Sequence, residues 1–155
     1  MTSLQKLLIN HCPGLLLALF LVPTLALAAA SPGVEVRNGY VRGLPPGTVN
    51  TSAYMTLVNN TEETLVLTGA TTPAANNVMI HTTVRRQGGM MSMEHVMSAE
   101  IPAHGQLKLA TGGMHLMLMG MKRQLRDGNT VKMTLQFEGG ESVAIELPVI
   151  SVLNE

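Results

Sequence analysis

The chain has 155 residues and a formal net charge of zero at pH 7, because its 10 Lys and Arg side chains balance 10 Asp and Glu side chains. This composition provides no basic patch for nucleic acid and no acidic tail. The small aromatic fraction, 3%, argues against an aromatic stacking platform for sugars or bases.

Residues 1–30 are predicted to be a secretory signal peptide. They carry one charged side chain, Lys6, and an apolar run that starts at Leu15, is interrupted at Pro23 and ends in Ala28-Ala29-Ala30. The run is short for a membrane span, and its small terminal residues fit a cleavage site. An uncleaved N-terminal anchor is the alternative. Residues 31–155 are expected to form a single exported domain without a further membrane span.

The only cysteine, Cys12, lies inside this leader, after Ile9-Asn10-His11, which is a poor context for lipid attachment. The mature chain would then contain no cysteine. This excludes a disulfide framework, a thiol nucleophile and a thiolate metal site. It also excludes an ordinary blue-copper electron carrier, which needs a cysteine ligand.

After the leader, apolar and polar residues alternate in short runs that are separated by glycine, proline and asparagine. The predicted strands cover residues 34–42, 53–58, 64–67, 78–85, 90–97, 107–109, 115–119, 131–138 and 143–149. Residues 101–105 are predicted to form a turn, and Gly139-Gly140 a two-residue hairpin turn. About nine short strands without a helical period favour an all-β sandwich or barrel with antiparallel connections.

One stretch, residues 79–121, contains nine of the 12 methionines and four of the five histidines. Methionine offers a soft thioether and histidine an imidazole, and together these donors suit a soft metal ion, Cu(I) above all. The stretch is therefore the candidate functional region, and the rest of the mature chain is predicted to be its scaffold.

The spacing inside this stretch suggests two local ligand pairs. Residues 115–119 alternate strictly, so His115 and Met117 share one face of a strand. His81 and Met93 flank the predicted turn Gln87-Gly88-Gly89 and should lie on one face of a hairpin, directly opposite or one diagonal step apart. If the tertiary structure brings the two pairs together, they form a four-ligand N2S2 site.

Most methionines in proteins fill cores, and several of these should do the same. Met90 and Met91 are expected to be partly exposed beside the proposed ligand, and Met79 to border the site. The methionines expected in the core are Met55, Met97, Met119 and Met133.

The histidines also have simpler explanations. His104 lies in a turn and is expected to be solvated, and His95, although it shares the strand parity of Met93, is expected to be an exposed strand residue and only an extra ligand at most. His81 and His115 stand in apolar strands, where a buried imidazole needs a hydrogen-bond partner or a metal.

Enzyme motifs are missing from the sequence. It contains no nucleophile elbow and no paired-carboxylate motif, and the single aspartate, Asp127, is predicted to be a turn residue. Gly88-Gly89 and Gly112-Gly113 lack the context of a phosphate loop. The protein is therefore not expected to be an enzyme.

The run from His81 to Met117 resembles the signature of the periplasmic copper chaperones called PCuAC. That pattern reads His, optional Met, ten residues, Met, twenty-one residues, His, any residue, Met. Here Thr82 occupies the optional Met position, and the remaining positions fall on His81, Met93, His115 and Met117. Flanking stretches such as residues 53–57 and 115–120 are similar too, and the resemblance covers residues 34–150.

This resemblance implies a cupredoxin-like, antiparallel Greek-key β-sandwich that binds one Cu(I) through His81, Met93, His115 and Met117. It also implies a monomeric periplasmic protein that delivers copper to the dinuclear copper centre of cytochrome c oxidase, alongside Sco-type assembly proteins. Some members carry a C-terminal extension rich in His and Met that binds Cu(II). Residues 151–155 contain neither residue, so no such second site is expected there.

Two other functions remain open from the sequence. The methionine-rich strands could form an adaptable surface of a protein-interaction module. The chain could also be a periplasmic copper storage or resistance protein, which would hold several ions per chain. A metal titration distinguishes the three.

Overall fold

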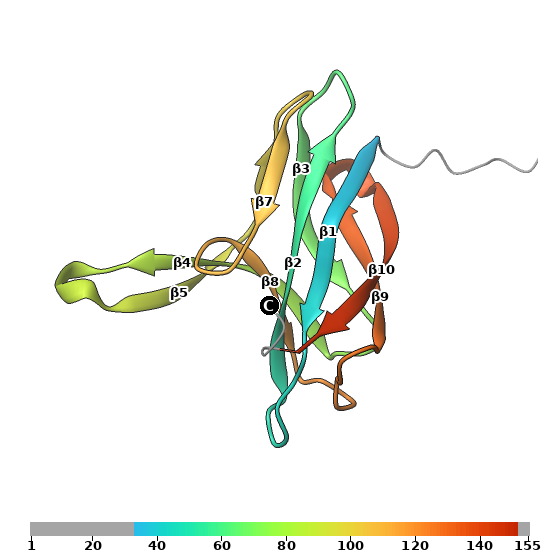
Figure 1. Cartoon of the computed structure of the whole chain (residues 1–155). Helices are drawn as coiled ribbons and strands as arrows, with labels where there is room; N and C mark the ends of the chain where they lie inside the picture. Colours follow the sequence, from blue (N-terminus) through green and yellow to red (C-terminus); the bar gives the residue numbers. More distant parts are fainter. Residues whose placement is uncertain (1–32, 152–155) are drawn as a thin grey trace, which may run out of the picture.

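The computed structural model describes residues 33–151; the predicted leader, residues 1–30, lies outside this range (Figure 1). Among the described residues, no helix is long and apolar enough to cross a membrane. The strands are β1 (Val34–Arg42), β2 (Asn50–Asn59), β3 (Leu65–Thr71), β4 (Asn77–Arg85), β5 (Met91–Val96), β6 (Ala99–Ile101), β7 (Gln106–Leu109), β8 (His115–Met119), β9 (Thr130–Phe137) and β10 (Ser142–Ile150).

The strands form two layers. The first has the order β5-β4-β8-β2-β1, with β7 paired to β2 beyond the end of β8, and the second has the order β10-β9-β3-β6. This confirms the predicted all-β sandwich, and the fold is consistent with a cupredoxin-like Greek key. One pairing is not antiparallel: β1 and β10 run parallel where Val41 meets Val149, and this contact joins the two layers.

Strict alternation along the strands divides the side chains of the first layer between its two faces. Ala53 and Leu57 of β2, and Leu116 and Leu118 of β8, point inward and are fully buried. Burying one such leucine stabilises the fold by roughly 1.5–3 kcal/mol. Because side-chain direction has a period of two, the odd residues of β4, β5 and β8 lie together on the outer face of this layer.

Two hairpins use the same loop chemistry. Gln87–Gly89 joins β4 to β5, and Glu138–Gly140 joins β9 to β10; both glycines of each loop have φ between 78° and 87°. The expectation of a two-residue turn at Gly139-Gly140 was wrong, because the Phe137 amide donates to the Glu141 carbonyl at 2.9 Å and Glu138 therefore belongs to the loop. A three-residue loop that ends in left-handed glycine suits the strand twist.

The short strand β6 was not predicted, since the sequence indicated only a turn from residue 101 onward. β6 pairs with β3, where Leu65 lies opposite Ile101. A buried side chain holds the end of β6: Asn59 Nδ2 donates to the Ile101 carbonyl at 3.0 Å and to the Pro102 carbonyl at 3.1 Å. A three-residue strand that depends on such long-range bonds leaves no periodic signal in the sequence.

The hairpin of β4 and β5 projects from the side of the sandwich (Figure 1). β4 pairs with β8 from Asn77 to His81, and with β5 from Ile80 to Arg85. His81 therefore stands where the two-layered body ends and the projecting part of the hairpin begins.

Candidate metal centre

His81 lies at the middle of a row of three imidazoles on the outer face of the first layer. It pairs with His95 of β5 on one side and with His115 of β8 on the other. The ring centroids are 5.9 Å apart for His81 and His95, and 6.2 Å apart for His81 and His115. Three strands thus bring three histidines into one line.

The two predicted methionine ligands lie diagonally from His81 on the same face. Met93 is opposite Thr83, the next outward residue of β4 after His81, and Met117 is opposite Met79, the preceding one. Of the two arrangements expected for His81 and Met93, the structure has the diagonal one. The other three predicted site residues therefore lie within one pairing step of His81, a distance that long side chains can span.

The two halves of this cluster differ in burial. His115 is 3% exposed, whereas Met93 is 61% exposed. The His115 ring packs against Tyr54, with centroids 6.1 Å apart, and Tyr54 packs in turn against Tyr40 at 5.2 Å and under the Arg42 guanidinium at 5.3 Å. Tyr54, which the sequence did not single out, therefore fixes the buried side of the site.

Two buried nitrogen atoms are left without a hydrogen-bond partner among the described residues: Nδ1 of His81 and Nε2 of His115. His115 Nδ1 lies 3.0 Å from the Gly113 carbonyl, so the neutral ring donates from Nδ1 and keeps its lone pair on Nε2. Unpaired buried polar atoms cost roughly 1–3 kcal/mol each. An imidazole held through a backbone carbonyl, with its other nitrogen bare, is the usual arrangement of a metal ligand.

Burial lowers the pKa of His81 from its ordinary value of 6.5, and positive charge on His115 or His95 would lower it further. The cause is mainly the loss of water around the ring, which disfavours the charged imidazolium. The lowered pKa keeps His81 in its neutral form, the only form that can bind a metal.

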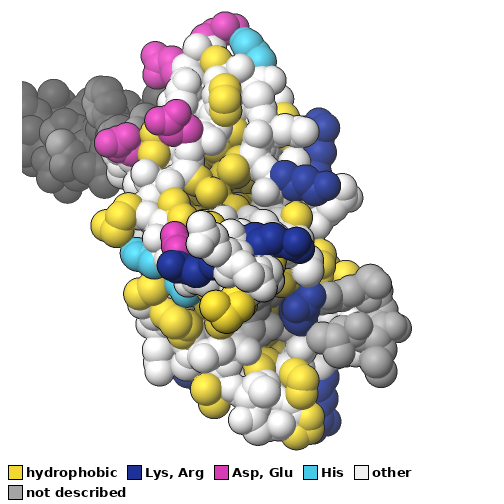
Figure 2. Space-filling view, turned by 90° about the vertical axis from the view of Figure 1, so that its left-hand side faces the viewer, with side chains coloured by type: hydrophobic (Ala, Val, Ile, Leu, Met, Phe, Trp, Pro, Cys, Tyr) yellow, Lys and Arg dark blue, Asp and Glu magenta, His cyan; other side chains and the backbone are white. Residues whose placement is uncertain are grey.

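The Met117 thioether is held from the neighbouring strand. Ser52 lies opposite Met117 in the pairing of β2 with β8, and its hydroxyl donates to the Met117 sulfur at 3.7 Å. Figure 2 shows the side from which the hairpin projects, where histidine side chains lie between hydrophobic ones. The mixture of imidazole and thioether on one surface is chemically suited to a soft cation.

The other methionines divide between core and surface. Met55 and Met133 are 2% exposed, which confirms them as core residues. The expectation that Met119 is a core residue was wrong, because it lies on the outer face of β8 and is only partly buried. The expectation that Met97 is a core residue was wrong: it is 77% exposed, because it follows the edge strand β5 where the chain leaves the sheet. Met90 and Met91 are exposed, as expected.

The two other histidines among residues 33–151 lie on the surface. His104 is exposed in the turn between β6 and β7, with Nε2 at 3.0 Å from a Glu62 carboxylate oxygen, which confirms it as a solvated residue. His95 is exposed as well. Its parity was visible in the sequence, but its place directly across from His81 depended on the register of the hairpin.

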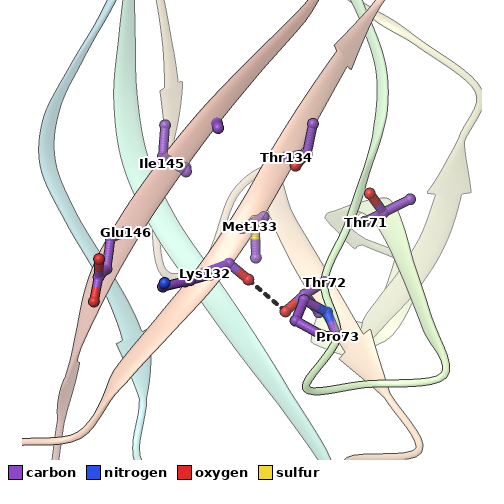
Figure 3. Close-up of a pocket in the computed structure, with 9 residues that line it drawn as sticks. Thr71, Thr72, Pro73, Lys132, Met133, Thr134, Ile145 and Glu146 are labelled. Carbon is purple, nitrogen blue, oxygen red and sulfur yellow. Dashed lines mark hydrogen bonds between the residues drawn. The ribbon is translucent and has the colours of Figure 1, made fainter.

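A hollow on the second layer has no histidine in its lining (Figure 3). It lies between β3, β9 and β10, and its lining includes Lys132, Glu146 and Thr72, whose hydroxyl donates to the Lys132 carbonyl at 2.6 Å. The one sulfur in its lining belongs to the core residue Met133. This hollow is thus separate from the histidine row and is a poor candidate for binding a soft metal ion.

Comparisons with known proteins show the family to which the chain belongs. Residues 34–149 match the family described as "Putative lipoprotein LpqE-like". The chain is 35% identical over 117 residues to "Putative lipoprotein Lxx21020" of Leifsonia xyli, a match that covers 76% of this chain and 69% of the relative.

Solved structures show the same fold. The CuI-DR1885 structure from Deinococcus radiodurans is 38% identical, covers 81% of this chain and 84% of its own, and has a TM-score of 0.64. The apo-DR1885 structure is 34% identical, covers 98% and 100%, and has a TM-score of 0.62. The copper-bound PCuAC domain from PmoF2, 21% identical with 79% and 96% covered, has a TM-score of 0.66 and supports the fold alone. The fold of this chain is similar to that of the PCuAC domains, in line with the resemblance of its sequence motif, and the chain belongs to the LpqE-like family.

Proposed function

We propose that this protein is a metallochaperone that carries one Cu(I) ion, held by His81, Met93, His115 and Met117. The observation that carries the proposal is the pair of buried, unpartnered nitrogens of His81 and His115 on one sheet face. A Cu(I) ion would satisfy both lone pairs, and the diagonal methionines would supply two soft sulfur donors. The relative whose structure carries Cu(I), CuI-DR1885, supports the identity of the ion.

The donor set suits binding followed by release. Neutral thioethers bind Cu(I) more weakly than thiolates do, and they form no disulfides in an oxidising compartment. Met93 is on the exposed side and His115 on the buried side. An acceptor could therefore replace the ligands one at a time, starting from the hairpin. The weakness of this set is oxidation of Met93 or Met117 to the sulfoxide, which removes the soft donor.

The cellular role follows from the family resemblance and the leader. We place the protein in the periplasm, exported by residues 1–30, with residues 31–155 as a single domain. Export is supported by the names of its lipoprotein relatives. Its acceptor would be the copper-centre subunit of cytochrome c oxidase, with Sco-type proteins as partners. The protein is expected to act as a monomer and to catalyse no reaction.

X-ray absorption of the Cu(I)-loaded protein, together with an anaerobic Cu(I) titration, tests this function. We expect about one ion per chain and a mixed shell of two nitrogen and two sulfur donors. A shell without sulfur would contradict the site, and several ions per chain would favour the storage or resistance function instead.

A second candidate is a protein-interaction module, which the exposed methionines of the hairpin favour. Met90, Met91 and Met97 are 68%, 55% and 77% exposed. Such flexible apolar side chains adapt to different partners. Binding of an acceptor that persists unchanged after removal of Cu(I) with a chelator would support this role over metal delivery.

A further inference from the structure

One imidazole of the row, His95, has no part in the proposed Cu(I) site. It lies directly across from His81, on the edge strand β5, with the ring centroids 5.9 Å apart. His115 lies directly across from His81 on the other side. His95 is the outermost member of the row and is exposed, whereas His115 is buried.

His95 lies one strand away from the unpartnered nitrogen of His81 and two strands away from that of His115. Directly opposed residues in an antiparallel pair have Cβ atoms about 4.5–5.5 Å apart. In residues 33–151 no three His, Cys, Asp or Glu side chains are already grouped around one point. The third imidazole must therefore arrive by rotation of the His95 side chain, which its exposure permits.

The neighbouring charged groups do not compete for this position. Glu94 alternates to the opposite face of the hairpin and pairs there with Arg86, whose Nη2 lies 2.7 Å from the Glu94 carboxylate. The residues that share the face of His95 next to it along β5 are Met93 and, beyond the strand end, Met97. The side chain directly across from His81 on the β5 side is thus another imidazole.

The oxidation state of copper decides whether it prefers thioether sulfur or imidazole nitrogen. Cu(I) accepts thioether sulfur, whereas Cu(II) prefers nitrogen and oxygen donors in a tetragonal arrangement. We propose that this face contains a second, overlapping ligand set, His81, His95 and His115, that binds Cu(II), with water completing the coordination. The proposal rests on the proposed function, because His81 and His115 belong to both sets. It assigns His95 to the oxidised ion and Met93 to the reduced ion, so that the protein retains copper in either state.

The test compares two substitutions on neighbouring positions of β5 in the untagged protein. Cu(II) is titrated in air against a competing chelator, with nitrogen superhyperfine structure in the EPR spectrum as the second readout, and Cu(I) is titrated anaerobically. His95→Gln should weaken Cu(II) binding by at least about tenfold and remove one nitrogen from the EPR pattern, with Cu(I) affinity unchanged. Met93→Leu should do the reverse, weakening Cu(I) and leaving Cu(II) unchanged.

His104→Asn serves as the matched control, because His104 is also an exposed histidine and Asn tolerates its φ of 53°. Equal Cu(II) affinity and an equal nitrogen count in the wild type and His95→Gln would overturn the inference. The same holds if His95→Gln weakens Cu(I) and Cu(II) alike, since His95 would then be an ordinary ligand. Either result leaves the Cu(I) function intact, whereas failure of the wild type to bind Cu(I) would contradict the proposed function itself.

Discussion

The two sides of the histidine row differ in how firmly the fold holds them. On the β8 side, His115 is 3% exposed, hydrogen bonded through Nδ1 and packed on Tyr54, and Met117 accepts a hydrogen bond from Ser52. On the β5 side, Met93 is 61% exposed and lies on an edge strand of a projecting hairpin. One half of the candidate site is preorganised by the body of the sandwich, and the other half lies on an exposed edge strand.

This difference suggests that the two sides contribute differently to Cu(I) affinity and to the rate of Cu(I) exchange. A fixed imidazole and a fixed thioether lose little side-chain entropy when they bind an ion, so they should supply most of the affinity. An exposed thioether on an edge strand should control how quickly the ion arrives and leaves. The substitutions below separate the two halves.

The largest effect is expected from removal of the fixed pair. The double substitution His115→Gln with Met117→Leu should lower Cu(I) affinity by at least about 100-fold, because it removes the preorganised donors. A competition titration with a Cu(I) chelator measures the change. Met119→Leu, two residues further along the same face of β8, is the control, and an equal loss there would mean that the strand rather than the donors was damaged.

Tyr54→Leu tests whether packing holds the fixed half in place. The loss of the Tyr54 ring, which is 5% exposed, should lower the free energy of unfolding by roughly 2 kcal/mol. It should also weaken Cu(I) binding several-fold, since His115 loses its support. Chemical denaturation and the same titration measure both. Tyr40→Leu, which touches Tyr54, should leave Cu(I) affinity unchanged; if the two variants bind alike, Tyr54 has no positioning role.

On the exposed half, Met93→Leu should weaken Cu(I) binding by about tenfold, chiefly through faster release. Stopped-flow transfer to a chelator gives the rate. Met90→Leu, on an equally exposed methionine at the hairpin tip, should behave as the wild type. A slower release in Met93→Leu would show that this thioether is not a ligand.

The smallest expected effect is on the pH dependence of the protein without copper. Because the pKa of His81 is below 6.5 in the folded state, the unfolded chain binds more protons than the folded one just below pH 6.5. The free energy of unfolding should therefore decrease as the pH falls from 6.5 toward the lower folded pKa. Denaturation curves across this range measure the slope, and His81→Gln should reduce it. An unchanged slope in His81→Gln would assign the effect to other groups.

The sequence predicted the local part of the site because that part depends only on strand periodicity. Alternation in residues 115–119 put His115 and Met117 on one face, and the Gly-Gly loop put His81 and Met93 on one face of a hairpin. It could not predict the exposure of Met97, because methionine serves equally in cores and at edges. Nor could it predict Tyr54, which meets His115 through the pairing of β2 with β8.

The sequence by itself determined the all-β class, the outward parity of the histidines and methionines, and the family motif. The tertiary structure alone decided that β4 lies between β5 and β8, and therefore that three imidazoles form one line with a buried end and an exposed end. The physical reason is the separation along the chain of the residues that determine each feature. Side-chain direction along a strand is set by each residue's own backbone geometry, whereas strand order and burial arise from packing between segments far apart in the chain.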